Sequence, residues 1–110
     1  MISSVIAMIA AATAAQASDT TRAAREAFTA CLRSFVSQSI EARKEVSAFE
    51  AEFPQQCTTQ EAAFREAVIR RDTAMRATRA SAEESANLEI EDARANFSDR
   101  FTVAMTPRSN

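Results

Sequence analysis

The chain contains no glycine among its 110 residues and only two prolines. Glycine is the residue that most easily adopts a positive φ, which tight β-hairpins require. Phosphate-cradling loops and dinucleotide folds also need glycine where the backbone approaches a ligand. The absence of glycine therefore argues against β-hairpin and nucleotide-binding folds, and it leaves a helical fold as the expectation.

Histidine is also absent from the sequence. Without it the chain cannot form a His-based catalytic triad, an HExxH zinc site or a His-ligated haem site. Bundle di-iron sites need a Glu-x-x-His motif and are excluded as well. We therefore expect that the protein is not an enzyme, and that it holds neither a cofactor nor a metal ion.

The N-terminal segment is apolar, and residues 2–15 carry no charge. The small-x-small sequence Ala15-Gln16-Ala17 follows, an arrangement typical of a secretory signal peptide, although the first residues lack Lys and Arg. The run of 14 residues is shorter than the ~20 that a membrane-spanning helix needs. We predict a signal peptide over residues 1–17, with an alanine-rich helix of the domain or an uncleaved anchor as alternatives.

The remaining chain, residues 18–110, carries 13 basic and 15 acidic residues, a net charge of −2. Lys44 is the only lysine, and this use of arginine, together with much alanine, indicates a GC-rich genome and hence a bacterium. Export then leads to a periplasmic or secreted protein. A nearly neutral chain gives no electrostatic reason to bind nucleic acid or an anionic membrane. We expect no nucleic-acid partner, and membrane contact only transiently through the signal peptide.

Cys31 and Cys57 are the only cysteines, and in an oxidising compartment two cysteines predict one disulfide, with two free thiols as the alternative. Their Cα atoms must then lie within about 7 Å, which an unbroken helix over 28–53 forbids. A stripe at heptad-like spacing favours that unbroken helix. The stripe consists of Phe28, Leu32, Phe35, Ser39, Ala42, Val46, Phe49 and Phe53.

A capping box, Ser47-Ala48-Phe49-Glu50, instead marks a new helix over 47–52. A turn near residues 44–46 would return Cys57 to Cys31, and we favour this turned arrangement. Pro54 ends the second helix because proline removes a hydrogen bond of the helix ladder.

Another capping box, Thr58-Thr59-Gln60-Glu61, predicts the start of a third helix. Its apolar face comprises Phe64, Val68, Met75, Ala82, Ala86, Ile90, Ala93, Phe97, Phe101 and Ala104. We expect ion pairs at i,i+4 spacing, namely Glu61–Arg65, Glu66–Arg70 and Asp72–Arg76. Because Ser81-Ala82-Glu83-Glu84 is a further possible cap, this helix either runs straight through or kinks at 78–81.

These patterns predict an all-α protein, a small helical bundle or hairpin of three to four helices with a Cys31–Cys57 disulfide. The helical domain covers residues 18–106, and residues 107–110 form a frayed tail. Seven phenylalanines, a few aliphatic residues and alanines supply a thin core. A thin core makes both the disulfide and self-association more useful for stability.

Two charged clusters are candidate sites. The basic cluster consists of Arg65, Arg70, Arg71, Arg76 and Arg79, and the acidic cluster of Glu83, Glu84, Glu89, Glu91, Asp92 and Asp99. The arginines could bind phosphate or lipid head groups, and the carboxylates could bind calcium or act as an acid/base pair. An ordinary solvated helix face explains both clusters more simply, since no calcium loop and no aromatic residue for base stacking accompanies them.

We therefore expect a small exported helical protein that binds another macromolecule without catalysing a reaction. Exposed phenylalanine or methionine side chains and the two charge zones would carry the binding. The alternative is a self-assembling structural protein, a homodimer in which the basic half of the long C-terminal helix pairs with the acidic half of a second copy. The sequence identifies neither the partner nor the pathway.

Overall fold

A computed structural model of the protein describes the backbone of residues 2–107 and the side chains of residues 15–107. This part of the chain contains four α-helices and no strand, so the prediction of an all-α fold is confirmed. Residue 1 of the predicted signal peptide and residues 108–110 of the predicted tail lie outside it. The elements are α1 (Ile2–Glu41), α2 (Val46–Glu52), the short 3-10 helix η1 (Phe53–Gln55), α3 (Thr58–Ala74) and α4 (Arg79–Met105).

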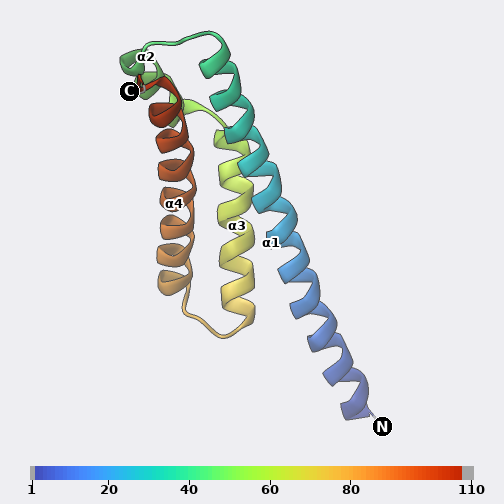
Figure 1. The fold of residues 1–110 in the computed structure, drawn as a ribbon. Coiled ribbons are helices and arrows are strands. Elements are labelled where there is room, and N and C mark those ends of the chain that lie inside the picture. The colour runs from blue at the N-terminus through green and yellow to red at the C-terminus, as the bar shows by residue number, and fades with distance from the viewer. Residues whose placement is uncertain (1, 108–110) are drawn as a thin grey trace.

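Three of the helices, α1, α3 and α4, form a bundle (Figure 1). Helices α3 and α4 make an antiparallel hairpin, and α1 lies beside both with its direction parallel to α4. The N-terminal part of α1 extends beyond the α3–α4 turn. At the other end of the bundle, α2 and η1 lie close to the C-terminal end of α4, and we call residues 42–57 the cap segment.

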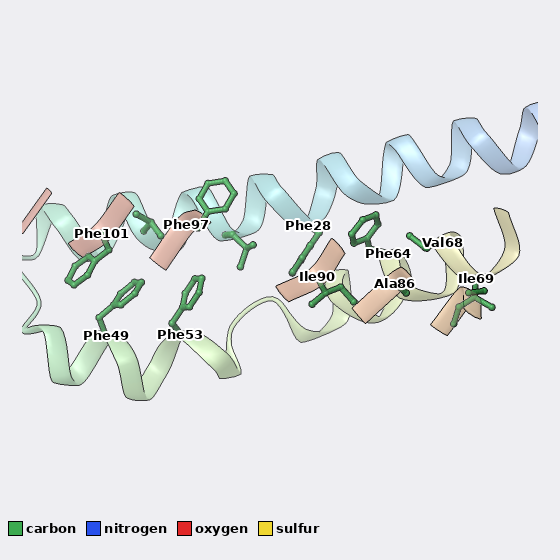
Figure 2. Close-up of a cluster of buried hydrophobic side chains, with 13 residues drawn as sticks. Phe28, Phe49, Phe53, Phe64, Val68, Ile69, Ala86, Ile90, Phe97 and Phe101 are labelled. Atoms are coloured by element: carbon green, nitrogen blue, oxygen red, sulfur yellow. The ribbon is translucent and has the colours of Figure 1, made fainter. Parts of the chain in front are cut away.

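Aromatic side chains build most of the core (Figure 2). Phe28 of α1 stacks on Phe64 of α3 with ring centroids 5.8 Å apart, and Phe49 of the cap segment stacks on Phe101 of α4 at 3.9 Å. Six of the seven phenylalanines are buried, and Phe35 is half-buried. No phenylalanine is therefore left as an exposed side chain, which corrects that half of the expectation, whereas a methionine, Met75, is exposed.

Helix α1 ends with a left-handed residue that is not glycine. Arg43 has φ 52°, and the backbone N–H groups of Arg43 and Lys44 donate to the carbonyls of Ile40 and Ser39. This pair of bonds defines a Schellman motif, which usually has glycine at the left-handed position. The predicted turn near residues 44–46 is confirmed. The Ser47 capping box is wrong, because the N-cap of α2 is Glu45.

The same motif ends α3 and reverses the chain. Arg76 has φ 71°, its N–H donates to Thr73 O at 3.0 Å, and Ala77 N–H donates to Asp72 O at 2.9 Å. Thr78 then caps α4, because its side chain accepts from Ser81 N–H at 3.1 Å. The chain therefore reverses direction at residues 75–78. The alternative of a straight helix is wrong, and the alternative of a kink at 78–81 placed the break slightly too late.

Two further sequence expectations are corrected at these helix ends. The N-cap of α3 is Cys57, so Thr58 is already helical and does not form the predicted capping box. Met75 lies in the turn and is 71% exposed, so it does not belong to the buried stripe.

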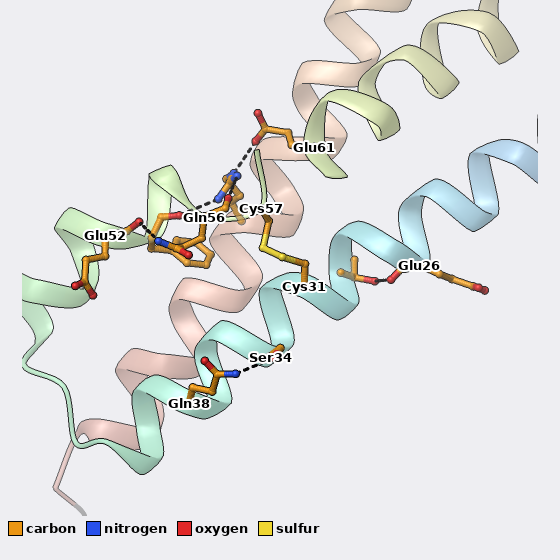
Figure 3. Close-up of a disulfide and its surroundings, with 11 residues drawn as sticks. Glu26, Cys31, Ser34, Gln38, Glu52, Gln56, Cys57 and Glu61 are labelled. Carbon is orange, nitrogen blue, oxygen red and sulfur yellow. Dashed lines mark hydrogen bonds and ion pairs between the residues drawn. A yellow bond between two sulfur atoms is a disulfide. The ribbon is translucent and has the colours of Figure 1, made fainter. Parts of the chain in front are cut away.

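The disulfide joins α1 to the residue before α3 (Figure 3). The Cα atoms of Cys31 and Cys57 lie 5.9 Å apart, within the range that a disulfide bridges. The predicted pairing is confirmed. It fixes the end of the cap segment to α1, and the cap segment places Phe49 and Phe53 over the core.

Candidate binding groove between α1 and α4

The predicted basic cluster does not form one patch. Arg65 and Arg70 are five residues apart in α3, which places them about 140° apart around the helix axis. Arg65 donates to the side chain of Asn87 on α4, and Arg79 pairs with Glu83 at 3.0 Å. Arg70 and Arg76 are exposed, and neither makes an ion pair within residues 15–107. The cluster is therefore dispersed over several surfaces.

Arg71 is the member of that cluster with the most partners. It binds Asp72 at 2.9 Å and Glu89 of α4 at 3.2 Å. Desolvation of the guanidinium lowers its pKa, but the hydrogen bonds and charges of Asp72 and Glu89 outweigh this effect and raise the pKa above its usual value. Glu89 also accepts from Arg25 of α1 at 2.7 Å, so this network joins all three bundle helices.

The predicted acidic cluster is divided in the same way. Glu83 and Glu89 are paired with arginines, whereas the remaining members, Glu84, Glu91, Asp92 and Asp99, are exposed on α4. Within the part of the chain whose side chains are described, no three side chains of metal-ligating type come together to hold an ion. The structure therefore gives the calcium interpretation no support.

The charge zones of the predicted long helix face each other within one chain. Because the chain reverses at residues 75–78, Arg71 of the basic half meets Glu89 of the acidic half. None of the three predicted i,i+4 pairs forms among the described residues, and two of their acids have other partners, since Asp72 binds Arg71 of the same helix and Glu61 binds a residue of α4. That residue of α4 is Arg94, which binds Glu61 at 2.7 Å.

A surface groove with a cavity volume of about 330 Å³ lies between α1 and α4. Helix α1 contributes Arg25, Thr29 and Arg33 to its walls. Helix α4 contributes Glu89, Asp92, Asn96 and Arg100. The apolar lining residues are Phe64, Ala93 and Phe97, all of which are buried or half-buried. The groove therefore combines an apolar floor with charged walls.

Two arginines converge on one aromatic ring of this groove. The guanidinium carbon of Arg33 lies 5.8 Å from the centroid of the Phe97 ring, and that of Arg100 lies 4.5 Å from it. Neither guanidinium makes an ion pair or a hydrogen bond with another described residue. The third lining arginine, Arg25, is already bound to Glu89.

Sequence reasoning missed this pair of arginines. Arg100 follows Phe97 by three residues, so their contact on one helix face can be recognised locally. Arg33 lies on a helix far away in the sequence, and only the parallel packing of α1 against α4 brings it to the same ring.

The fold and the groove define a small helical bundle, closed by one disulfide, with a polar groove on its surface. Comparison with protein-family models, with curated protein sequences and with solved structures finds no match to this chain. Among the residues searched, which are those the structure describes, no helix is both long enough and apolar enough to cross a membrane.

Proposed function

We propose that this chain is an exported, non-enzymatic binding protein, and that its partner is a macromolecule that docks in the groove between α1 and α4. The observation that carries the proposal is the convergence of Arg33 and Arg100 on Phe97. Stacking on an aromatic face leaves the N–H groups at the edge of a guanidinium available for a ligand. Two such groups that line one groove form a recognition surface.

The other arginines of the described chain differ from this pair. Arg25, Arg71, Arg79 and Arg94 each bind a carboxylate of the same chain. Arg65 donates to Asn87, and the remaining unpaired arginines, Arg22, Arg43, Arg70 and Arg76, contact no aromatic ring among the described residues. Arg33 and Arg100 therefore combine free hydrogen-bond donors with a fixed position.

The side chains of the groove favour recognition over reaction. Glu89 already accepts hydrogen bonds from two arginines, and Thr29 donates its hydroxyl proton to Arg25 O at 3.0 Å. A nucleophile needs an adjacent base that is free to take its proton. These side chains are occupied in structural contacts, which supports a binding role.

Two features of α1 support export. The first side chain of α1 that is described as buried is Thr21, so cleavage after Ala17 removes none of the described buried side chains. Thr21 donates to Ala17 O at 2.8 Å and to Ala67 O at 3.1 Å, and the second acceptor remains after cleavage. The Cys31–Cys57 disulfide also fits an oxidising compartment.

Photo-cross-linking in the source organism tests the binding role. A photoreactive amino acid at Asn96, an exposed groove residue, should give one discrete adduct with another macromolecule. The matched control is the same amino acid at Thr102, which is exposed on α4 and does not line the groove. An adduct from Thr102 of equal yield, or no adduct from Asn96, contradicts the proposal.

Self-assembly through the C-terminal helices has less support, because α3 and α4 already pack against each other within one chain. Light scattering at tens of micromolar protein distinguishes the two functions. A monomer is expected, and a stable homodimer would favour the structural alternative.

A further inference from the structure

We infer that the groove recognises an acidic protein segment, with the guanidinium groups of Arg33 and Arg100 binding side-chain carboxylates of the partner. This inference rests on the proposed binding function and adds the chemistry of the partner. It depends on three properties of the groove, namely the arrangement of the two arginines, the balance of charge and the limited volume.

The arrangement of the two arginines suits carboxylates. Both guanidinium carbons contact the ring of Phe97, so they lie no farther apart than the sum of 5.8 Å and 4.5 Å. Alternate residues of an extended segment are about 7 Å apart. A planar guanidinium binds a carboxylate through two parallel N–H bonds. Two acidic side chains of one segment can therefore each reach one arginine.

The balance of charge in the groove is positive although the whole chain has a net charge of −2. Arg25 and Glu89 compensate each other at 2.7 Å. Arg33 and Arg100 then face only one further lining carboxylate, that of Asp92. The groove therefore has a local positive excess that attracts an acidic ligand although the chain as a whole is negative.

The volume of the groove limits the size of the bound segment. About 330 Å³ lies at the lower end of the roughly 300–1,000 Å³ of small-ligand pockets, so only a few side chains enter. The amide of Asn96 is exposed and makes no hydrogen bond with a described residue, so it can bind the backbone of the segment. Ala93 and Phe97 supply apolar contact.

An anionic membrane fits this face less well. Beside the groove, α4 carries exposed Asp99, about 60° around the helix axis from Asn96, as well as Asp92 of the groove wall. A flat anionic surface would approach both carboxylates, and like charges repel. A narrow peptide contacts the groove alone, so a protein segment is the ligand that the charge distribution favours.

Fluorescence anisotropy of labelled peptides tests the inference with the exported, disulfide-bonded protein. We expect hexaglutamate to bind at low salt and hexaglutamine not to bind. Arg33→Gln and Arg100→Gln should each weaken binding about three- to fivefold, the upper part of the range for an exposed ion pair. Asp92→Asn should tighten binding about twofold, because it removes a like charge from the groove.

The matched controls are Arg22→Gln and Arg70→Gln, which remove the same charge from exposed positions outside the groove. Less than a twofold effect is expected from either. An equal loss in these controls would mean that attraction depends on total charge, and no binding of hexaglutamate would overturn the inference. Arg33-dependent binding to phosphatidylglycerol vesicles without binding to the peptide would reassign the groove to lipid.

Competition separates this inference from the proposed function. If excess hexaglutamate suppresses the Asn96 adduct, both are supported. If the adduct forms and hexaglutamate has no effect, the groove binds a macromolecule of other chemistry and only the acidic-segment inference fails. If no adduct forms, the proposed function fails.

Discussion

Arg94 Nε of α4 lies 2.7 Å from Glu61 Oε1 in the first turn of α3. The same guanidinium donates to Phe53 O at 3.1 Å and to Gln56 O at 2.7 Å. Phe53 O already accepts from Gln56 N–H at 3.0 Å, so Arg94 is its second donor, and at Gln56 O, the C-cap of η1, Arg94 supplies a donor to a helix-end carbonyl. One side chain thereby attaches the cap segment to α4.

Loss of this side chain should destabilise the fold. Arg94 is only 16% exposed, and removing it leaves Glu61 without its partner. We expect Arg94→Ala to lower the free energy of unfolding by about 3 kcal/mol, measured by urea denaturation. Arg22→Ala, at an exposed position of α1, should change it by less than about 0.5 kcal/mol. Equal effects of the two substitutions would contradict this role.

The disulfide should stabilise the cap segment most. Closing the chain between Cys31 and Cys57 is worth about 3 kcal/mol in the chain-entropy model. We expect the Cys31→Ser/Cys57→Ser double variant to lose about that much and to exchange amide hydrogens fastest in residues 42–57. If hydrogen exchange rises uniformly along the bundle, the disulfide does not act on the cap segment in particular.

Glycine should be favourable at the two Schellman positions. Arg43 and Arg76 have φ values of 52° and 71°, a conformation that costs a residue with a Cβ about 1 kcal/mol or more. Arg76→Gly should therefore raise the free energy of unfolding by about 1 kcal/mol. Arg70→Gly, in the middle of α3, should lower it by about 1 kcal/mol. Destabilisation by both substitutions would contradict the left-handed turn.

A buried hydroxyl lies in the core near the end of α1. Ser39 is 1% exposed, and its Oγ makes no hydrogen bond within the described chain. A buried polar group without a partner is unfavourable, so Ser39→Ala should stabilise the protein by about 1 kcal/mol in thermal or urea unfolding. Ser37→Ala, at an exposed position, should have almost no effect. A loss of stability in Ser39→Ala would show that the hydroxyl has a partner.

Intact mass spectrometry tests export and oxidation together. The product isolated from the source organism should begin at Ser18, and alkylation should label two thiols only after reduction. A product that begins at Met1, or thiols that are labelled without reductant, would contradict the predicted compartment.

The features predicted correctly from the sequence depend on short-range patterns. Helices over most of the chain follow from apolar residues at helical spacing and from the absence of glycine. The turn before α2 was predicted from the geometry of a disulfide. Cys57 can reach Cys31 only if the first helix ends between them and the chain turns back. The buried phenylalanines follow from the same spacing, since each predicted stripe must face a core.

The turn between α3 and α4 was harder to predict because it uses an arginine where glycine is usual. Nothing near Arg76 in the sequence marks a left-handed residue, and the pattern of helix formers continues across it. Packing of Ala82 and Ala86 against the core compensates for the cost of that conformation. Tertiary contact therefore decided where the long helix breaks.

By itself, the sequence determined that the chain is helical, that two cysteines are available for pairing and which residues are apolar enough to fill a core. Only the tertiary structure decided which charged residues meet. An arginine pairs with whichever carboxylate the packing of helices brings near it. Glu61, for example, binds Arg94 of the neighbouring helix and not Arg65, which follows it by four residues in its own helix. The groove arose in the same way, because Arg33 and Arg100 share one ring only when α1 packs parallel to α4.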